Sequence, residues 1–169
     1  MFTRNFYNIL YSHIMGVHIP NGLTDVNGTK YTCYDMPSKG EHLQMPNRIS
    51  YIGGSFVSAG YVVVGSGSTP ATLDDYCIEN PISTINHVGV TTSTDENNSV
   101  IKTLNFQNYD SKAITIREVG VSMTGYMKDA SSGSSTFMAY RKVLDTPYVV
   151  PAGANGYITL KFDMPTIPV

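Results

Sequence analysis

The hydrophobic positions near the start of the chain recur with a helical period. Between residues 5 and 15 they stand at i, i+3, i+4, i+7 and i+8, which predicts an amphipathic helix. Its apolar face would consist of Phe6, Ile9, Leu10, His13 and Ile14. Gly16 predicts the end of this helix. Because so short a helix is marginal on its own, we expect it to dock either on its own domain or on a partner subunit.

The periodic pattern stops between residues 17 and 49. Asn-Gly dipeptides at 21–22 and 27–28, together with three prolines, leave room for one short strand near residues 29–34. A connection this long is typical of an extended or binding segment. Two interpretations fit: an arm that lies along a neighbouring subunit, or a surface loop with one hairpin.

From residue 51 onwards the pattern is typical of strands. Short apolar runs separated by polar turns predict strands at residues 61–64, 82–90, 100–106, 113–123 and 135–144. Near the end, residues alternate strictly between apolar and polar from Tyr157 to Met164, which predicts one buried and one wet face. The fold predicted is all-β: an antiparallel β-sandwich over residues 51–169, preceded by a short N-terminal helix and an extended N-terminal arm over residues 1–50.

The composition favours contact surfaces over long solvated helices. Charged residues make up 14% of the chain, against about 25% in average proteins, and polar uncharged residues and 12 tyrosines take their place. The formal net charge of −2 indicates neither nucleic acid nor an anionic membrane as partner. Low charge lets copies pack closely, so we expect a homo-oligomer. We find no secretory signal and no membrane span, which predicts synthesis in the cytoplasm.

Candidate chemistry is sparse, and the chain is predicted to have no catalytic residues, no cofactor and no metal site. The histidines, at 13, 18, 42 and 87, lack the spacing of a zinc site. Cys33 and Cys77 have no paired spacing, which favours two free thiols but leaves a disulfide possible. The Gly-Ser-Gly-Ser run at residues 65–68 follows a strand, yet it lacks the Lys-Ser/Thr ending of a phosphate loop.

One tight acidic group stands at Asp74, Asp75 and Glu79. Thr72 and Asp75 match a capping box, and Pro81 would end the helical turn that starts there. Paired carboxylates also serve glycoside hydrolysis. The chain has no tryptophan to form the usual sugar platform, so the capping interpretation is preferred.

Two charges share strand faces with apolar neighbours. Glu118 alternates in step with Ile114 and Ile116, and Arg141 is in step with Phe137, Ala139 and Val143. A charge in such a place is costly unless it is paired. We hypothesise that Glu118 and Arg141 pair across adjacent strands or across a subunit boundary. The alternative is that strand bulges turn both side chains to solvent.

Four stretches of the chain carry a family resemblance. They are RNFYNIL at residues 4–10, VVVGSGSTPATLDDYCIENPI at 62–82, ITIREVGVSM at 114–123 and MAYRKVLDTPYVVPAGANGYITLKF at 138–162. Their order and spacing resemble small structural proteins of tailed-bacteriophage virions, of the head-fibre, capsid auxiliary or tail adaptor type. The positions that match are Tyr76, Glu118, Gly120 and Arg141. Cys77, Ile78 and Tyr140 depart from the pattern, which leaves the subgroup open.

The resemblance implies a β-sandwich subunit without enzymatic activity. Its partners would be copies of itself and other virion proteins, namely capsid, portal or tail, and fibre subunits, and its location would be the virion. Residues implied in assembly or structure are Phe6, Ile9, Leu10, Tyr76, Glu118, Gly120 and Arg141. One alternative is a receptor- or glycan-binding module of a phage fibre. The least favoured alternative is a virion-associated lytic hydrolase.

Overall fold

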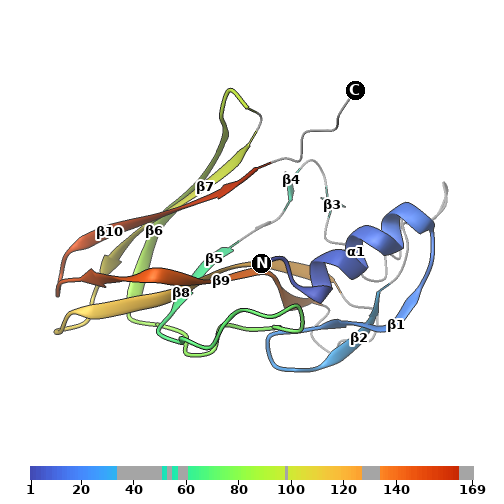
Figure 1. Ribbon diagram of the computed structural model, residues 1–169, viewed down its shortest axis with the longest axis horizontal. Helices are drawn as coiled ribbons and strands as arrows, with labels where there is room; N and C mark the ends of the chain where they lie inside the picture. Colours follow the sequence, from blue (N-terminus) through green and yellow to red (C-terminus); the bar gives the residue numbers. More distant parts are fainter. Residues whose placement is uncertain (34–50, 53–54, 57–60, 98, 127–133, 164–169) are drawn as a thin grey trace. The chain divides into compact units, whose positions relative to one another are not determined.

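The structure is a computed structural model, and it describes residues 1–33, 51–52, 55–56, 61–97, 99–126 and 134–163 (Figure 1). This part of the chain forms one helix, α1 (Arg4–Met15), and the strands β1 (Ile19–Thr24), β2 (Lys30–Cys33), β3 (Tyr51–Ile52), β4 (Ser55–Phe56), β5 (Tyr61–Gly65), β6 (Ile85–Thr94), β7 (Val100–Asn108), β8 (Ile114–Tyr126), β9 (Ser134–Val150) and β10 (Asn155–Phe162). The pairings given for these strands are antiparallel. The predicted all-β class with a short N-terminal helix is therefore confirmed.

The chain divides into two compact units, and the division differs from the predicted boundary at residue 50. Unit 1 combines residues 1–81 with 117–145, and unit 2 combines residues 82–116 with 146–169. The cause is long-range pairing of the first residues. Phe2 forms a β-bridge with Tyr140, and the Thr3 N–H donates to the Ala139 carbonyl at 3.0 Å. The start of the chain therefore belongs to the same unit as the first part of β9.

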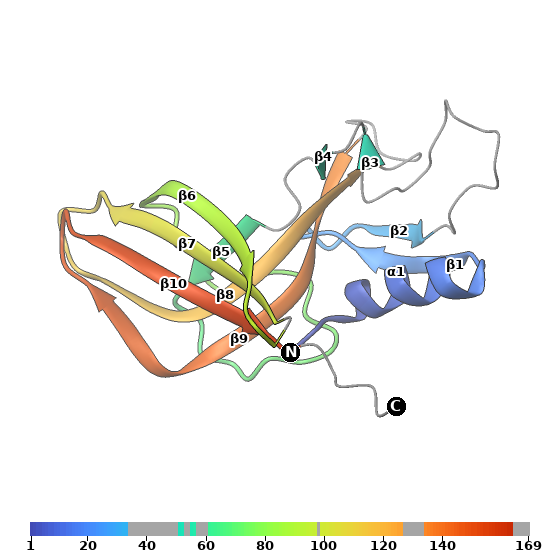
Figure 2. The same ribbon diagram turned by 90° about the horizontal axis from the view of Figure 1, so that it is seen from above.

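In unit 1, α1 packs beside a hairpin of β1 and β2 (Figure 2). The predicted end of the helix is confirmed, because Gly16 adopts the left-handed conformation (φ 61°) and its N–H donates to the Ser12 carbonyl. The strand predicted near residues 29–34 is β2. Residues 17–33 thus form the hairpin of the second interpretation and not an extended arm; residues 34–50, the rest of the predicted arm, lie outside the described residues.

The buried face of α1 differs from the predicted apolar face. Ile9 packs against the buried cluster of Leu23, Cys33 and Phe137, but the side chains of Leu10 and Ile14 are exposed. In their place Asn5 is buried. The reason is that the neighbouring backbone needs partners: the Asn5 amide donates to the Thr24 carbonyl at 2.7 Å and accepts from the Thr24 N–H at 2.8 Å.

The second sheet of unit 1 has the order β5-β8-β9. β5 pairs with β8 in a regular register from Tyr61↔Ser122 to Gly65↔Glu118. Beyond β5 the chain makes a loop, residues 66–80, whose two ends meet. Gly65 bridges to Pro81, and the Ser66 N–H donates to the Asn80 carbonyl at 2.9 Å. This closed loop lies over the buried charges described below.

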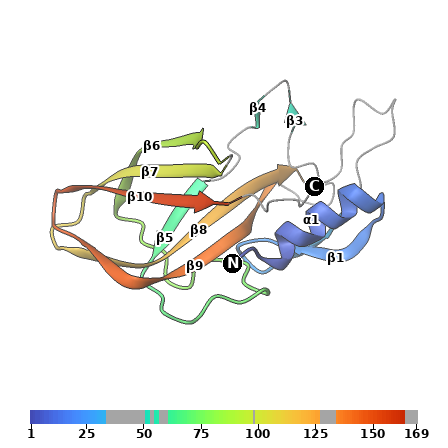
Figure 3. The same cartoon turned by 45° about the horizontal axis from the view of Figure 1, so that its top comes forward.

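Unit 2 contains a sheet of order β10-β7-β6. In β10 the side chains of Ile158 and Leu160 are buried, while Tyr157, Thr159 and Lys161 are exposed, which confirms the predicted alternation from residue 157 to 161. Phe162 is half-buried, and Met164 lies outside the described residues. The start of β8 and the end of β9, which belong to this unit, run along the sheet as a second layer (Figure 3). Their buried residues in unit 2 are Ile114, Ile116 and Val150.

Both cysteines have free thiols, as the sequence favoured, with Cys33 buried and Cys77 half-buried. Within the described ranges, no helix combines the length and the hydrophobicity that a membrane crossing requires.

We expect Asn5→Ala to destabilise unit 1. Loss of the amide leaves the backbone groups of Thr24 without their partner, which costs about 1–3 kcal/mol per buried group. The measurement is the free energy of unfolding in urea. Tyr11→Ala on the exposed side of the same helix is the control, and it should change that free energy by no more than about 0.5 kcal/mol. Equal effects of the two substitutions would contradict this account of the helix.

Candidate functional site

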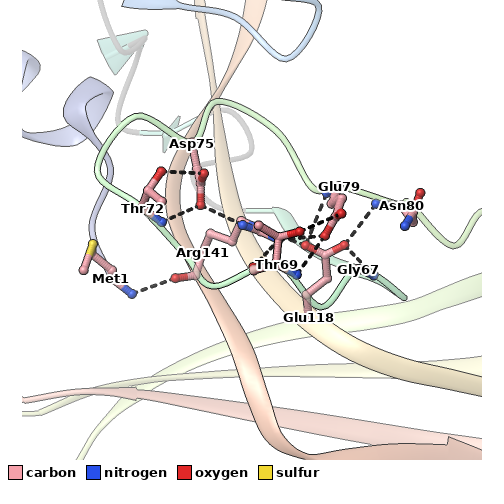
Figure 4. A network of polar contacts seen from close by, with 9 residues as sticks. All are labelled: Met1, Gly67, Thr69, Thr72, Asp75, Glu79, Asn80, Glu118 and Arg141. Carbon is pink, nitrogen blue, oxygen red and sulfur yellow. Dashed lines mark hydrogen bonds and ion pairs between the residues drawn. The ribbon is translucent and has the colours of Figure 1, made fainter.

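Glu118 of β8 and Arg141 of β9 form a buried ion pair at the centre of unit 1 (Figure 4). The Arg141 Nε lies 2.8 Å from Glu118 Oε2, and the two side chains are 4% and 0% exposed. The predicted pairing across adjacent strands is confirmed within one chain. The alternative, in which bulges turn both side chains to solvent, is wrong.

The Glu118 carboxylate is held by backbone N–H groups as well as by arginine. Oε1 accepts from the N–H of Gly67 at 2.9 Å and of Asn80 at 3.0 Å, and Oε2 accepts from the N–H of Glu79 at 3.2 Å. All three donors belong to the loop 66–80. A carboxylate with this many donors is compensated for the loss of water.

Glycines allow the loop to approach the carboxylate so closely. A Cβ on Gly67 would lie 2.4 Å from Glu118 Oε1, and one on Gly65 would lie 2.5 Å from the same atom. On the sheet beneath, a Cβ on Gly120 would lie 2.7 Å from Met138 Sδ. The Gly-Ser-Gly-Ser run does bind an anion through a backbone N–H, and that anion is a side chain of the same protein.

The rest of the Arg141 guanidinium binds the loop. Nη1 lies 2.8 Å from Asp75 Oδ2 and Nη2 lies 3.6 Å from Glu79 Oε2. Nη2 also donates to the Thr69 carbonyl at 3.2 Å. One arginine therefore fastens the loop to the sheet at three further points.

The predicted helical turn after Thr72 is limited to one hydrogen-bonded turn, in which the Asp75 N–H donates to the Thr72 carbonyl at 3.4 Å. The capping-box contact itself is present, because Asp75 accepts from the Thr72 N–H at 2.9 Å and from its hydroxyl at 2.8 Å. No helix follows, since Asp75 also reaches Arg141 and the N–H groups of Glu79 and Asn80 are committed to Glu118.

The pKa values of the loop carboxyl groups Asp75 and Glu79 are lowered, which favours their ionised forms. Burial by itself raises the pKa of Asp75, but hydrogen bonds from Arg141 and Thr72 outweigh it and hold that pKa below the ordinary 3.8. Hydrogen bonds from the N–H and hydroxyl of Thr69 lower the pKa of Glu79. The pKa of Arg141 is lowered by burial and raised more strongly by Asp75 and Glu118. Asp75, Glu79 and Arg141 are therefore charged at neutral pH.

An open cavity of about 230 Å³ adjoins the network. Its lining consists of Thr69, Asp74, Asp75, Tyr76, Cys77, Glu79 and Arg141. A glycosidase needs one carboxyl that stays protonated at working pH, whereas Asp74, Asp75 and Glu79 all have lowered pKa values. Burial raises the pKa of the Cys77 thiol, which disfavours the nucleophilic thiolate. These pKa directions do not favour a carboxyl general acid or a thiolate nucleophile at this cavity.

The structure brings four of the sequence-predicted residues to this region. Glu118 and Arg141 form its centre, Gly120 lies beneath Met138, and Tyr76 lines the cavity, where its ring faces Gly28. The helix residues are elsewhere in unit 1. Phe6 stacks on Phe2 with ring centroids 4.3 Å apart, Ile9 joins a hydrophobic cluster, and Leu10 is exposed.

Sequence reasoning missed the loop partners of the ion pair. Asp75 and Glu79 were noted as an acidic group but were not connected with Arg141. One signal was available: an arginine has five N–H donors, so a buried one needs more than a single carboxylate. The acidic group of Asp74, Asp75 and Glu79 is the evident source of these further acceptors.

Among the described residues, no three His, Cys, Asp or Glu side chains are grouped so that they could hold a metal ion. No protein-family model, curated protein or solved structure matches the chain.

We expect Glu118→Gln to lower the free energy of unfolding by about 3–5 kcal/mol, because it leaves Arg141 buried beside a neutral group. The substitution also replaces one acceptor oxygen of residue 118 by an NH₂ group, which cannot accept the hydrogen bonds of the loop N–H groups. Urea unfolding measures the change. Asp145→Asn is the control, since that carboxylate is exposed in a 3.8 Å pair with Lys142. If the two substitutions had the same small effect, the network would not hold the unit together.

Gly67→Ala should destabilise the chain by about 1–3 kcal/mol through overpacking against Glu118. The added methyl group has no room, because Glu118 Oε1 is fixed by two N–H donors and the carboxylate as a whole by four. Gly89→Ala in β6 is the matched control, since a Cβ there would meet nothing within 4 Å. The melting temperature followed by circular dichroism distinguishes the two. A Gly67→Ala protein as stable as Gly89→Ala would contradict the close approach of loop and carboxylate.

Proposed function

We propose that this chain is a non-enzymatic structural protein of a tailed-bacteriophage virion, and that it works by binding other subunits of the particle. The observation that carries the proposal is the outer side of α1. Its five large side chains, between 45% and 69% exposed, are Tyr7, Leu10, Tyr11, Ile14 and Met15. Soluble monomers rarely leave such a contiguous apolar surface uncovered, and it is typical of a protein contact.

The polar network supports the same proposal. Its charges are directed inward, at one another and at the backbone of the loop 66–80. Such an arrangement stabilises a scaffold, whereas a catalytic site keeps at least one group available to a substrate.

The family resemblance supports the virion as the location. The motifs that carry it supply the network residue by residue. The stretch at 62–82 provides Gly67, Thr69 and Asp75, the stretch at 114–123 provides Glu118, and the stretch at 138–162 provides Arg141. A chain that shares these motifs would form the same network of ion pairs and hydrogen bonds between the loop and the sheet. The proposed partners are capsid, portal or tail, and fibre subunits, together with copies of the chain itself.

Particles of a phage whose genome encodes this chain should contain it. The measurement is mass spectrometry of purified particles that carry either the natural chain or the double variant Leu10→Gln and Ile14→Gln. Because this variant removes apolar area only from the exposed side of α1, it should fold normally. Its loss of binding energy should reduce incorporation about tenfold or more, since each 1.4 kcal/mol changes an equilibrium constant tenfold.

Lys142→Gln is the control for this experiment, because its side chain is also exposed and belongs to β9, not to the outer side of α1. Absence of the chain from purified particles would contradict the virion proposal. Turnover of cell-wall polysaccharide that disappears in Asp75→Asn would instead favour the lytic hydrolase. Binding of the free chain on a glycan array, with no incorporation into particles beyond trace amounts, would favour the glycan-binding module.

A further inference from the structure

β6 lies at one edge of the sheet in unit 2. In the part of the chain that the structure describes, its hydrogen-bonded neighbour is β7 (Figure 1). Half of the backbone N–H and C=O groups of an edge strand point away from its neighbour, and they form a template for another extended strand.

The sequence of β6 does not protect this edge. Natural proteins protect edges with lysine, other charges or proline, but INHVGVTTST contains none of these. After Ile85 the strand is exposed along nearly its whole length. A register shift between His87 and Gly89 interrupts the ladder, so that residues 89–94 form the regular part. The strand at the other edge, β10, carries Lys161, which pairs with Asp95 and Asp163.

The absence of charge identifies the strand that fits best. When a strand pairs with its own copy antiparallel about a two-fold axis, a charge near the axis lies close to its own copy, and like charges opposite each other are unfavourable. β6 carries no Lys, Arg, Asp or Glu, so that this penalty is absent. The sequence Thr-Thr-Ser-Thr at residues 91–94 instead offers hydroxyl pairs, which are favourable across strands.

We propose that a second copy of this chain binds along β6, strand to strand and antiparallel, and so extends the three-stranded sheet across a two-fold axis. This inference deepens the proposed function, and it rests on that function for the statement that copies meet in a particle. The occupant is another β6, and the binding groups are the outward backbone N–H and C=O groups of residues 89–94.

The hairpin geometry identifies which groups face outward. The Asp95 N–H donates to the Ser99 carbonyl, on the β7 side. Because the direction of backbone groups alternates along a strand, the N–H of Thr92 points away from β7. Proline at position 92 therefore removes a donor to the second copy and leaves the β6–β7 ladder intact, and edge strands tolerate proline at such positions.

The test is sedimentation velocity of the full chain over a concentration series. The natural chain should sediment as a dimer. Thr92→Pro should raise the dissociation constant at least about tenfold, a change of about 1.4 kcal/mol. Thr92→Ala, which keeps the N–H, should remain dimeric. If circular dichroism shows that Thr92→Pro does not fold, the double variant Thr91→Lys and Ser93→Lys replaces it, because it places like charges across the axis while keeping every N–H.

A natural chain that is monomeric at every concentration would overturn the inference. So would a folded Thr92→Pro protein, or a folded double-lysine protein where that replaces it, that dimerises as tightly as the natural chain. The virion proposal is tested separately by the content of purified particles. If the chain is incorporated into particles but is monomeric in solution, only the β6 pairing is contradicted. If it is dimeric but absent from particles, only the virion proposal is contradicted.

Discussion

The buried pair of Glu118 and Arg141 is the interaction on which unit 1 depends. Removing two charges from water costs several kcal/mol per ion, and their attraction offsets this only when the remaining donors and acceptors are also satisfied. Here the loop 66–80 supplies backbone N–H groups to Glu118, and it supplies carboxylates and a carbonyl to Arg141. The loop therefore cannot move without exposing an uncompensated charge. This cost, together with the burial of Ile78, explains why a long irregular segment holds one conformation.

The same constraint explains the composition of the loop. Gly65 and Gly67 are small because the carboxylate lies within 2.5 Å of where their Cβ atoms would be. Thr69 is suited to its position because its N–H and hydroxyl both bind Glu79. A glycine-rich run after a strand is usually considered as a phosphate site, since such N–H groups bind anions. In this chain the bound anion is the carboxylate of Glu118 on the neighbouring strand, β8.

Sequence patterns predicted the features that depend on the local spacing of apolar residues. They missed the contacts that depend on partners far away in the chain. The alternation in β10 was predicted because one face is buried, and the end of α1 because glycine takes the left-handed conformation of Gly16 without strain. The Glu118–Arg141 pair was predicted because both residues fall in step with apolar neighbours. The partner of Asp75, in contrast, lies 66 residues further along the chain, so a local capping pattern suggested a helix that does not form. Likewise, the helix buries Asn5 because of carbonyl and N–H groups on β1 that no pattern within the helix records.

The placement of charge limits how this protein can recognise anything else. With 14% charged residues, several of them buried or paired within the chain, the surface has little field to attract or repel a partner at a distance. Recognition of the kind proposed above would act at contact, through apolar side chains such as those of α1 and through backbone groups such as those of β6. Contacts of this kind depend weakly on salt and strongly on shape and local concentration. An assembled particle provides both conditions, because it holds copies in fixed positions beside one another.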